Sequence, residues 1–354
     1  MSKSLVSKQP KAVALISGGL DSLLAAKVLL EQGVHVEGIN FYTGFCVEGH
    51  THAIRAKDKK KVKRNNALWS AEQLGIKLHI VDVIEEYKDV LINPKHGYGA
   101  NMNPCLDCKG FMVKKALEWI KENDFDFIIT GEVMGQRPMS QRKDTMPIIA
   151  RESGANDLLL RPLCAKNLPE TKPEIEGWVD RDKLYGFSGR SRKPQIALAE
   201  AFGFEEWAQP AGGCCFLTDK AYSTKLVDLW QSRNDQRDYE MDDIMLLKVG
   251  RHIRPRKHFK LIIGREDGEN KYMEGYRKQY AHLHATSCVG PSVLIDGVLK
   301  DEDDFKLAAQ ITARFSKDRT KDSVTIEMTD LNGVSKAIDV KPLGSHEIQE
   351  AWQV

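Results

Sequence analysis

Residues 11–30 read KAVALISGGLDSLLAAKVLL, and this stretch decides the fold. An apolar run of strand length breaks at two glycines and resumes as an apolar run of helical length. The first amides of a helix have no partner within it, so a strand that turns through glycines into a helix directs free N–H groups at an anion. The stretch therefore predicts a phosphate site at residues 17–22. A second strand is expected at residues 34–41, and this alternation of strand and helix predicts an α/β fold, with a parallel sheet covered by helices on both faces.

The residue types in SGGLDS have different expected roles in binding a phosphate. Gly18 and Gly19 allow backbone conformations closed to other residues and a close approach to a ligand. Ser17 and Ser22 add hydroxyl donors, and Asp21 is placed to hold Mg²⁺ against the phosphates. The motif lacks the GKS or GKT ending of a Walker A loop and the spaced glycines of a dinucleotide site, which disfavours ordinary kinases and dehydrogenases.

Length and composition are those of a globular chain with two domains. The chain has 354 residues, of which 42% are hydrophobic and 29% charged. No window approaches the ~20 apolar residues of a membrane span, and the polar start lacks the apolar core of a signal peptide, so we expect a cytoplasmic protein without a membrane partner. The net charge is only +2, so nucleic-acid binding would depend on local patches.

Two basic runs are candidates for such patches. Residues 55–64, RAKDKKKVKR, carry seven basic residues and one acid, and residues 248–260 carry six Lys and Arg and no acid. Contacts with RNA phosphates would explain both runs. A solvated helix or loop face remains the alternative for the first run, and a solvated β-hairpin for the second.

The cysteines form a second candidate site. Cys105 and Cys108 have CxxC spacing where a loop becomes a helix, and Cys214 and Cys215 follow two glycines in QPAGGCCFLTD. Cys105, Cys108 and either Cys214 or Cys215 would suit a [4Fe-4S] cluster that leaves one iron open. Zinc, or a redox or persulfide set, remains an alternative. For Cys164 a structural role is favoured, and the remaining two, Cys46 and Cys288, are expected to be ordinary thiols.

Several motifs resemble those of known ATP-using enzymes. SGGLDS resembles the PP-loop of ATP pyrophosphatases, whose members adenylate a substrate and release pyrophosphate. TGEVMGQRPMSQ at residues 130–141, LLLRPL at 158–163 and KPEIEGWV at 172–179 are similar to the PP-loop domain of tRNA 4-thiouridine synthetases. NPCLDCK is similar to the NPC motif of tRNA 2-thiouridylases, and on that comparison Cys108 takes the place of their first functional cysteine and Cys214 or Cys215 that of the second.

The resemblance implies a set of contacts with ATP and Mg²⁺. Besides the SGGLDS residues, it places the end of the second strand and the start of the TGE run beside the nucleotide. These expected contacts are Phe41, Thr130, Gly131 and Gln136.

The resemblance also implies an organisation into domains. We expect a PP-loop domain over residues 1–205, a linker with cysteines over 206–235, and a small α/β domain over 236–354. KVGRHIR and IIGREDGEN in the last part look like the small domain of RNA-associated NFACT-type proteins. Glycine and proline positions place the likeliest flexible joint at residues 186–195 or 207–213.

The implied function is ATP-dependent tRNA thiolation, in which a uridine carbonyl oxygen is adenylated and replaced by sulfur, with 4-thiouridine favoured. tRNA, a sulfur donor (sulfide or a sulfur-carrier protein) and a possible homodimer are the expected partners. A 2-thiouridylase using a cysteine persulfide is the nearest alternative. An amide ligase for a small substrate would not need two basic runs or converging cysteines, and a protein that only binds nucleotide would not need Asp21.

Overall fold

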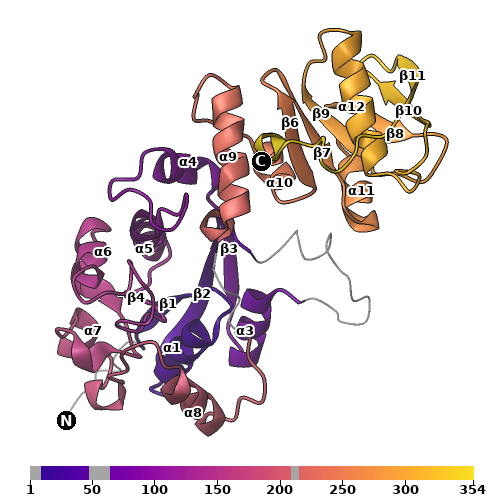
Figure 1. The fold of residues 1–354 in the computed structure, drawn as a ribbon. Helices are drawn as coiled ribbons and strands as arrows, with labels where there is room; N and C mark the ends of the chain where they lie inside the picture. Colours follow the sequence, from indigo (N-terminus) through magenta and orange to yellow (C-terminus); the bar gives the residue numbers. More distant parts are fainter. Residues whose placement is uncertain (1–8, 48–63, 209–214) are drawn as a thin grey trace, which may run out of the picture. The chain divides into compact units, whose positions relative to one another are not determined.

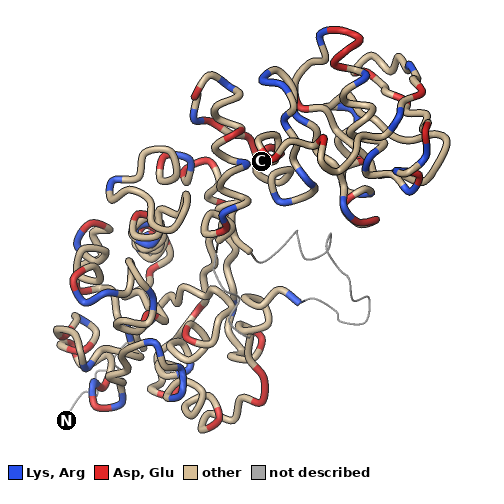
Figure 2. The backbone as a smooth tube through the Cα atoms, viewed as in Figure 1, with Lys and Arg blue, Asp and Glu red and all other residues tan. Residues whose placement is uncertain are grey.

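The structure, a computed structural model, describes residues 9–47, 64–208 and 215–354. The chain forms two compact units, and the boundary between them lies between Cys214 and Cys215 (Figure 1). Figure 2 shows basic and acidic residues interspersed along the backbone of both units, in keeping with the low net charge. Within these described ranges, no helix is both long and apolar enough to cross a membrane.

The first unit contains a parallel sheet in the order β3-β2-β1-β4-β5. From β1 the chain adds β2 and β3 on one side, and it then adds β4 and β5 on the other side of β1. At such a switch point, an α/β sheet typically binds ligands at the carboxyl ends of the two neighbouring strands, here β1 and β4. The predicted strand at residues 34–41 is confirmed within one residue. The strands are β1 (Lys11–Leu15), β2 (His35–Tyr42), β3 (Leu78–Asp82), β4 (Phe127–Ile129) and β5 (Leu159–Leu160).

Helices cover both faces of this sheet, as predicted (Figure 1). On one face, alternate residues of β1 pack under α1 (Leu20–Leu30), which α3 (Asn66–Leu74) and α8 (Lys193–Ala201) cover in turn. Because it is enclosed by sheet and helices, α1 is apolar nearly all round. On the other face, Val13 and Ile39 pack with α5 (Cys105–Glu122) and α6 (Met146–Glu152). The unit also contains α4 (Ile84–Ile92) and α7 (Lys172–Ile175).

The second unit is a smaller assembly of helices and an antiparallel sheet, in the order β11-β10-β8-β9-β7-β6. One face packs against α12, and α10 and α11 supply residues to a smaller cluster that includes Ile262 and Leu294. The strands are β6 (Arg251–Arg256), β7 (Phe259–Ile263), β8 (Ala281–Ala285), β9 (Val293–Gly297), β10 (Val324–Thr329) and β11 (Ser335–Val340). The helices are α9 (Lys220–Ser232), α10 (Met241–Leu246), α11 (Asp267–Glu274) and α12 (Glu302–Arg314).

Helix α9 belongs to this second unit, although the sequence suggested a linker over residues 206–235. The Lys225 ammonium donates to the carbonyls of Leu247 (3.2 Å) and Gly250 (3.1 Å), and the Tyr222 hydroxyl donates to the carbonyl of Ile244 (3.1 Å). These bonds attach α9 to α10 and to the turn that leads into β6. The second unit therefore begins well before residue 236.

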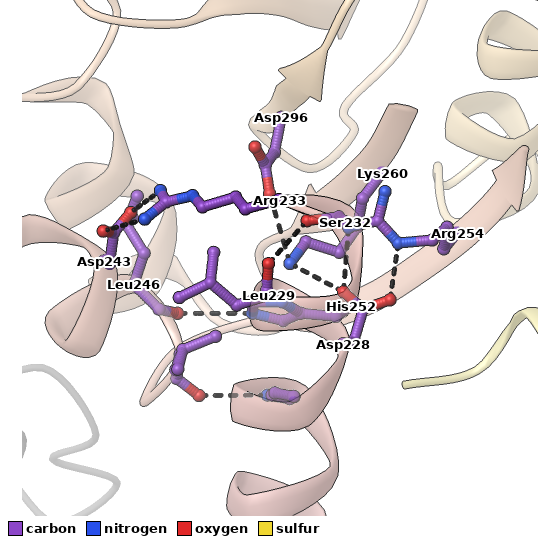
Figure 3. Close-up of polar contacts among 12 residues, drawn as sticks. Asp228, Leu229, Ser232, Arg233, Asp243, Leu246, His252, Arg254, Lys260 and Asp296 are labelled. Carbon is purple, nitrogen blue, oxygen red and sulfur yellow. Dashed lines mark hydrogen bonds and ion pairs between the residues drawn. The ribbon is translucent and has the colours of Figure 1, made fainter. Parts of the chain in front are cut away.

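The basic run at residues 248–260 is not a continuous basic surface. Lys248 and Lys260 are buried, and the Lys260 ammonium lies 3.1 Å from the Asp228 carboxylate and 3.2 Å from that of Asp296 (Figure 3). Arg254 also pairs with Asp228, its Nη2 lying 2.9 Å from Oδ2. The strands β6 and β7 turn these cations toward acids that are distant in sequence. Only three basic residues of the run are exposed, namely Arg251, Arg256 and Lys257.

Candidate nucleotide and thiol site

The phosphate loop follows β1 and uses its two glycines differently. Gly18 has a φ of +79°, and a Cβ there would lie 2.7 Å from the backbone of Asn66 and Ala67 at the start of α3. Gly19 has a φ of −87°, and a Cβ there would meet only the Ser17 hydroxyl, at 3.6 Å. Gly18 therefore uses a backbone conformation that favours glycine, whereas the backbone of Gly19 is one that other residues also adopt.

Hydrogen bonds inside the loop fix its shape. The Ser22 hydroxyl donates to the Gly19 carbonyl at 2.8 Å and accepts from the Ser17 amide at 3.3 Å, so the buried Ser22 closes the loop. Ser17 is exposed. The Asn40 side chain, a polar residue inside the apolar strand β2, donates to the Ile16 carbonyl at 2.7 Å and fixes the end of β1. Asn40 was not among the predicted site residues, although a lone amide in such a strand is a signal for it.

A second loop, residues 130–141, follows β4 and lies against the first. A Cβ on Gly131 would lie 2.5 Å from the Asp21 carbonyl oxygen and 2.5 Å from the Ser22 nitrogen. Only glycine permits this approach of the loop to the first turn of α1. The structure thus brings Gly131 and Asp21 together at the switch point, while their contacts with a nucleotide stay predictions.

In the described part of the chain, polar groups contact only one of the two carboxylate oxygens of Asp21. Gln136 Nε2 donates to Oδ2 at 2.6 Å, and Arg192 Nη2 lies 3.6 Å from the same oxygen. Burial raises the pKa of Asp21, and the charge of Arg192 and the Gln136 hydrogen bond oppose this effect. Oδ1 is buried and has no hydrogen-bond partner among the described residues. An unpaired carboxylate oxygen at this position fits a ligand for Mg²⁺.

Residues 186–195 are part of this site, so the flexible joint suggested there by the sequence is wrong. The Gly189 amide donates to the Met134 carbonyl at 2.8 Å, which aligns this segment with the second loop. Gln195 is fully buried, and its Nε2 donates to Gln136 Oε1 at 2.6 Å. Sequence reasoning missed Arg192 and Gln195 as neighbours of Asp21, because glycine and basic residues are also typical of linkers.

Two predicted nucleotide contacts have buried side chains. Phe41 is 5% exposed and packs in the core with Val13 and Val113. The Thr130 hydroxyl donates to the carboxylate of Glu132 at 3.0 Å, so it points toward an internal polar cluster. Any contact of Phe41 or Thr130 with a nucleotide would therefore come from the backbone.

Glu132 is the centre of that cluster. Arg161 Nε donates to Glu132 Oε2 at 2.9 Å, and both side chains are buried. Burial alone would raise the pKa of Glu132, but the positive charges of Arg161 and Lys109 hold that pKa below its usual value. Lys109 directly follows Cys108, so its charge couples this carboxylate electrostatically to the start of α5.

The CxxC pair lies in the first turn of α5. Cys105 and Cys108 are three residues apart, which places them on one side of the helix, and both are partly exposed. The Cys105 thiol donates to the Ser140 hydroxyl at 3.5 Å. Ser140 belongs to the same loop as Gln136, so residues 130–141 contact both Asp21 and Cys105.

The structural role favoured for Cys164 is confirmed. Its thiol is fully buried and donates to the Glu132 carbonyl at 3.2 Å. Burial raises the pKa of the Cys164 thiol to about 12. A thiol that stays protonated in this way is neither a nucleophile nor a metal ligand.

The remaining candidate cysteines stand at the boundary between the two units. Cys214 lies outside the described residues. Cys215 belongs to the second unit, where its Sγ accepts from the Leu217 amide at 3.4 Å. In the part of the chain that the structure describes, no group of three or more His, Cys, Asp or Glu is placed to hold a metal ion. The three-cysteine cluster therefore stays a prediction.

Two family models match the chain. Residues 7–194 match the model described as thiamine biosynthesis protein (ThiI), and residues 250–353 match the NFACT protein RNA binding domain. The first match covers the phosphate loop, the β4 loop and the CxxC turn. The second match covers the antiparallel sheet but not α9 or α10.

Curated relatives are similar to part of this chain. A probable tRNA sulfurtransferase of Thermococcus kodakarensis is 28% identical over 162 residues, which cover 45% of this chain and 38% of the relative. The tRNA-specific 2-thiouridylase MnmA of Campylobacter curvus is 31% identical over 125 residues, 34% of each chain. This chain therefore spans little more than a third of the length of these relatives.

Solved structures give distant matches. A 4-thiouridine synthetase–RNA complex with bound ATP has 20% identity and a TM-score of 0.34, over 57% of this chain and 55% of that one. The U34-tRNA thiolase NcsA from Methanococcus maripaludis, with its [4Fe-4S] cluster, has 19% identity and a TM-score of 0.29, over 70% and 74%. Likeness at this level carries no argument about function.

The family of the chain follows from the model that matches residues 7–194. That model spans more than half of the 354 residues, and it includes the two loops that meet at Asp21. The protein therefore belongs to the ThiI family.

Proposed function

We propose that the protein is an ATP-dependent tRNA sulfurtransferase that replaces a uridine carbonyl oxygen by sulfur, with 4-thiouridine as the favoured product. The loop at residues 130–141 carries this proposal, because it contacts Asp21 through Gln136 and Cys105 through Ser140. One short segment thus links a phosphate loop to a thiol pair. Membership of the ThiI family and the similar tRNA sulfurtransferase of T. kodakarensis support the same reaction.

The proposed first step activates the uridine. A carbonyl oxygen is a poor leaving group, so O4 attacks the α-phosphorus of ATP, and the bond from that phosphorus to pyrophosphate breaks. The amides at the start of α1 would stabilise the departing pyrophosphate. Asp21 would hold Mg²⁺ through its open Oδ1. A sulfur nucleophile then adds at C4, and AMP leaves with the original oxygen.

The cysteines would present the sulfur. Cys105 and Cys108, with Cys214 or Cys215, are the residues that would hold a [4Fe-4S] cluster, and the two CxxC thiols on one helical turn fit two of the three ligand positions. When bound, such a cluster would offer one open iron position to sulfur supplied as sulfide or by a carrier protein.

The persulfide route uses the same cysteines without a cluster. The outer sulfur of a persulfide on Cys108 would attack C4, and Cys214 or Cys215 would then attack the inner sulfur. This step forms a disulfide and releases the thiocarbonyl. A dithiol reductant would restore the two thiols.

Cluster binding can be tested on protein prepared without oxygen. We expect broad visible absorption and about four irons per chain. Cys108→Ala should lose the iron. Cys164→Ala should retain it, because the Cys164 thiol is buried and occupied by the Glu132 carbonyl. A colourless wild-type protein that contains zinc would contradict the cluster.

Formation of 2-thiouridine is the second candidate. It is favoured by the similarity to 2-thiouridylases, including that of C. curvus, and by the NPCLDCK segment, which contains both CxxC thiols. The activation step would be the same, with O2 in place of O4.

The decisive experiment is nucleoside analysis of tRNA from a strain that lacks the protein, complemented with wild type or with Asp21→Ala. Loss of 4-thiouridine that only the wild type restores would support the proposal, and selective loss of 2-thiouridine would support the second candidate. Unchanged thionucleosides would overturn both. In vitro, Asp21→Ala should abolish release of pyrophosphate and leave tRNA binding nearly intact.

The second unit is proposed to bind the tRNA. Its match to an RNA-binding family model supports this role, with residues 1–205 as the catalytic domain and 236–354 as the core of the RNA-binding domain. A homodimer would be compatible with this division of tasks.

A further inference from the structure

We propose that Gln195 is a positioning residue, which holds the Asp21 carboxylate so that one oxygen stays available to the divalent cation of a bound nucleotide. This inference rests on the proposed function in that Asp21 binds the cation. Gln195 lies in the first turn of α8, a helix that packs on α1. Gln195 is fully buried, and hydrogen bonding by its side chain opposes the effect of burial on the pKa of Asp21.

The side-chain amides of Gln195 and Gln136 can be oriented in one way only. A carboxylate only accepts hydrogen bonds, so Gln136 must present its NH₂ group to Asp21 Oδ2, at 2.6 Å. The Gln136 carbonyl oxygen then faces Gln195, which must present its own NH₂ group, also at 2.6 Å. Gln195 thus fixes which end of the Gln136 amide faces Asp21.

The arrangement leaves the two Asp21 oxygens in different states. Gln136 and Arg192 both approach Oδ2, whereas Oδ1 is buried and has no hydrogen-bond partner among the residues described. A divalent cation needs such an unoccupied carboxylate oxygen. Without the Gln195 donor, the Gln136 amide could turn its oxygen toward Asp21 and repel it, and the carboxylate would lose its fixed orientation. Groups that orient a metal ligand in this way typically affect metal affinity by about 10–100-fold.

Three variants separate positioning from packing. Gln195→Met keeps the length of the side chain but removes the donor. Gln195→Glu keeps the shape and, when ionised, can only accept. Ile196→Met is the matched control, because Ile196 is the next residue of α8 and is 37% exposed. The measurement is a Mg²⁺ titration of the binding of a non-hydrolysable ATP analogue to the full chain, with unfolding temperatures recorded in parallel.

We expect Gln195→Met to raise the Mg²⁺ concentration for half-maximal binding by about tenfold or more, with binding in the absence of Mg²⁺ unchanged. Gln195→Glu should be more impaired than Gln195→Met at neutral pH, because an ionised carboxylate can only accept hydrogen bonds. Ile196→Met should behave as wild type. Adding Gln136→Met to Gln195→Met should cause little further loss, because both changes interrupt one chain of hydrogen bonds.

An unchanged Mg²⁺ requirement in Gln195→Met would overturn the inference. So would an equal loss of binding with and without Mg²⁺, because that result indicates a packing role. The assay contains neither tRNA nor sulfur. A wild-type protein that binds the analogue with Mg²⁺ but does not thiolate tRNA would therefore overturn the proposed reaction while the Gln195 variants still decide this inference. A wild-type protein that does not bind the analogue overturns both.

Discussion

Individual residues of the phosphate loop have different structural roles, which the motif alone does not distinguish. Gly18 combines a positive φ with backbone contact to α3, whereas Gly19 has an ordinary extended backbone, and a Cβ there would make only an ordinary contact with the Ser17 hydroxyl. Ser22 closes the loop, and Ser17 remains exposed. One glycine is therefore needed for the fold, while the other is available to serve the ligand.

Alanine substitution should separate these two glycines. Gly18→Ala should lower the free energy of unfolding by about 1–3 kcal/mol, because its Cβ would overlap the backbone of Asn66 and Ala67 and φ is positive. Gly19→Ala should unfold like the wild type. Urea unfolding of both variants provides the measurement, and equal stability of the two would contradict this assignment.

At the scale of elements, α9 is held by charges that the sequence places far from it. Asp228 on α9 pairs with Arg254 of β6 and with Lys260 of β7, and the Lys260 side chain is only 1% exposed. The Lys225 ammonium on the same helix caps carbonyls after α10, where a positive charge is favourable. These contacts make α9 a structural part of the second unit, beyond the range of its family model.

Removing the Asp228 charge should therefore destabilise the second unit. We expect Asp228→Asn to cost about 2 kcal/mol, less than the ~3–5 kcal/mol for an isolated buried charge, because Lys260 keeps Asp296 at 3.2 Å. Asp267→Asn is the matched control. Asp267 is 85% exposed and its partner Lys271 is 73% exposed. Asp267→Asn should therefore lower the free energy of unfolding by less than about 0.5 kcal/mol.

The effect of Asp228→Asn should also depend on pH. Burial opposes ionisation, but Arg254 and Lys260 hold the pKa of Asp228 below its usual value. The stabilisation is therefore present above the unfolded pKa of about 3.9 and is lost as pH falls through the lower folded-state pKa. Urea unfolding should show a difference from wild type that is constant near neutral pH and shrinks in acid. A difference that grows in acid would contradict the charge pairing.

At the scale of the whole molecule, the proposed tRNA binding would use the cations that remain on the surface. Three cations of the run at 248–260 are buried or paired inside the second unit, and most of the run at 55–64 lies outside the described residues. Arg64 itself stacks on Trp69 and pairs with Glu206. In the second unit, the exposed part of the basic run is the set Arg251, Arg256 and Lys257.

Replacing Arg251, Arg256 and Lys257 together by alanine should weaken tRNA binding to a similar degree for all tRNA sequences. The plot of log affinity against log salt should become less steep, and the magnitude of its negative slope should decrease by about 0.7–0.9 for each phosphate that the variant no longer neutralises. Binding of ATP should not change. Lys271→Ala, an exposed change on α11, serves as the control. An unchanged salt dependence in the triple variant would exclude these residues from the RNA interface.

Local sequence patterns were enough to predict the strand, the phosphate loop and the helix at residues 11–30. SGGLDS turns β1 into α1 as expected, and α3 ends at Gly75, where the backbone is left-handed. Tertiary structure alone decided which polar residues meet. Asp21 and Gln136 are separated by 115 positions, and Gln136 and Gln195 by 59. The cations of β6 and β7 likewise turn toward acids on α9 and β9. Such pairings depend on strand order and helix packing, which bring distant residues together and leave no periodic trace in the chain.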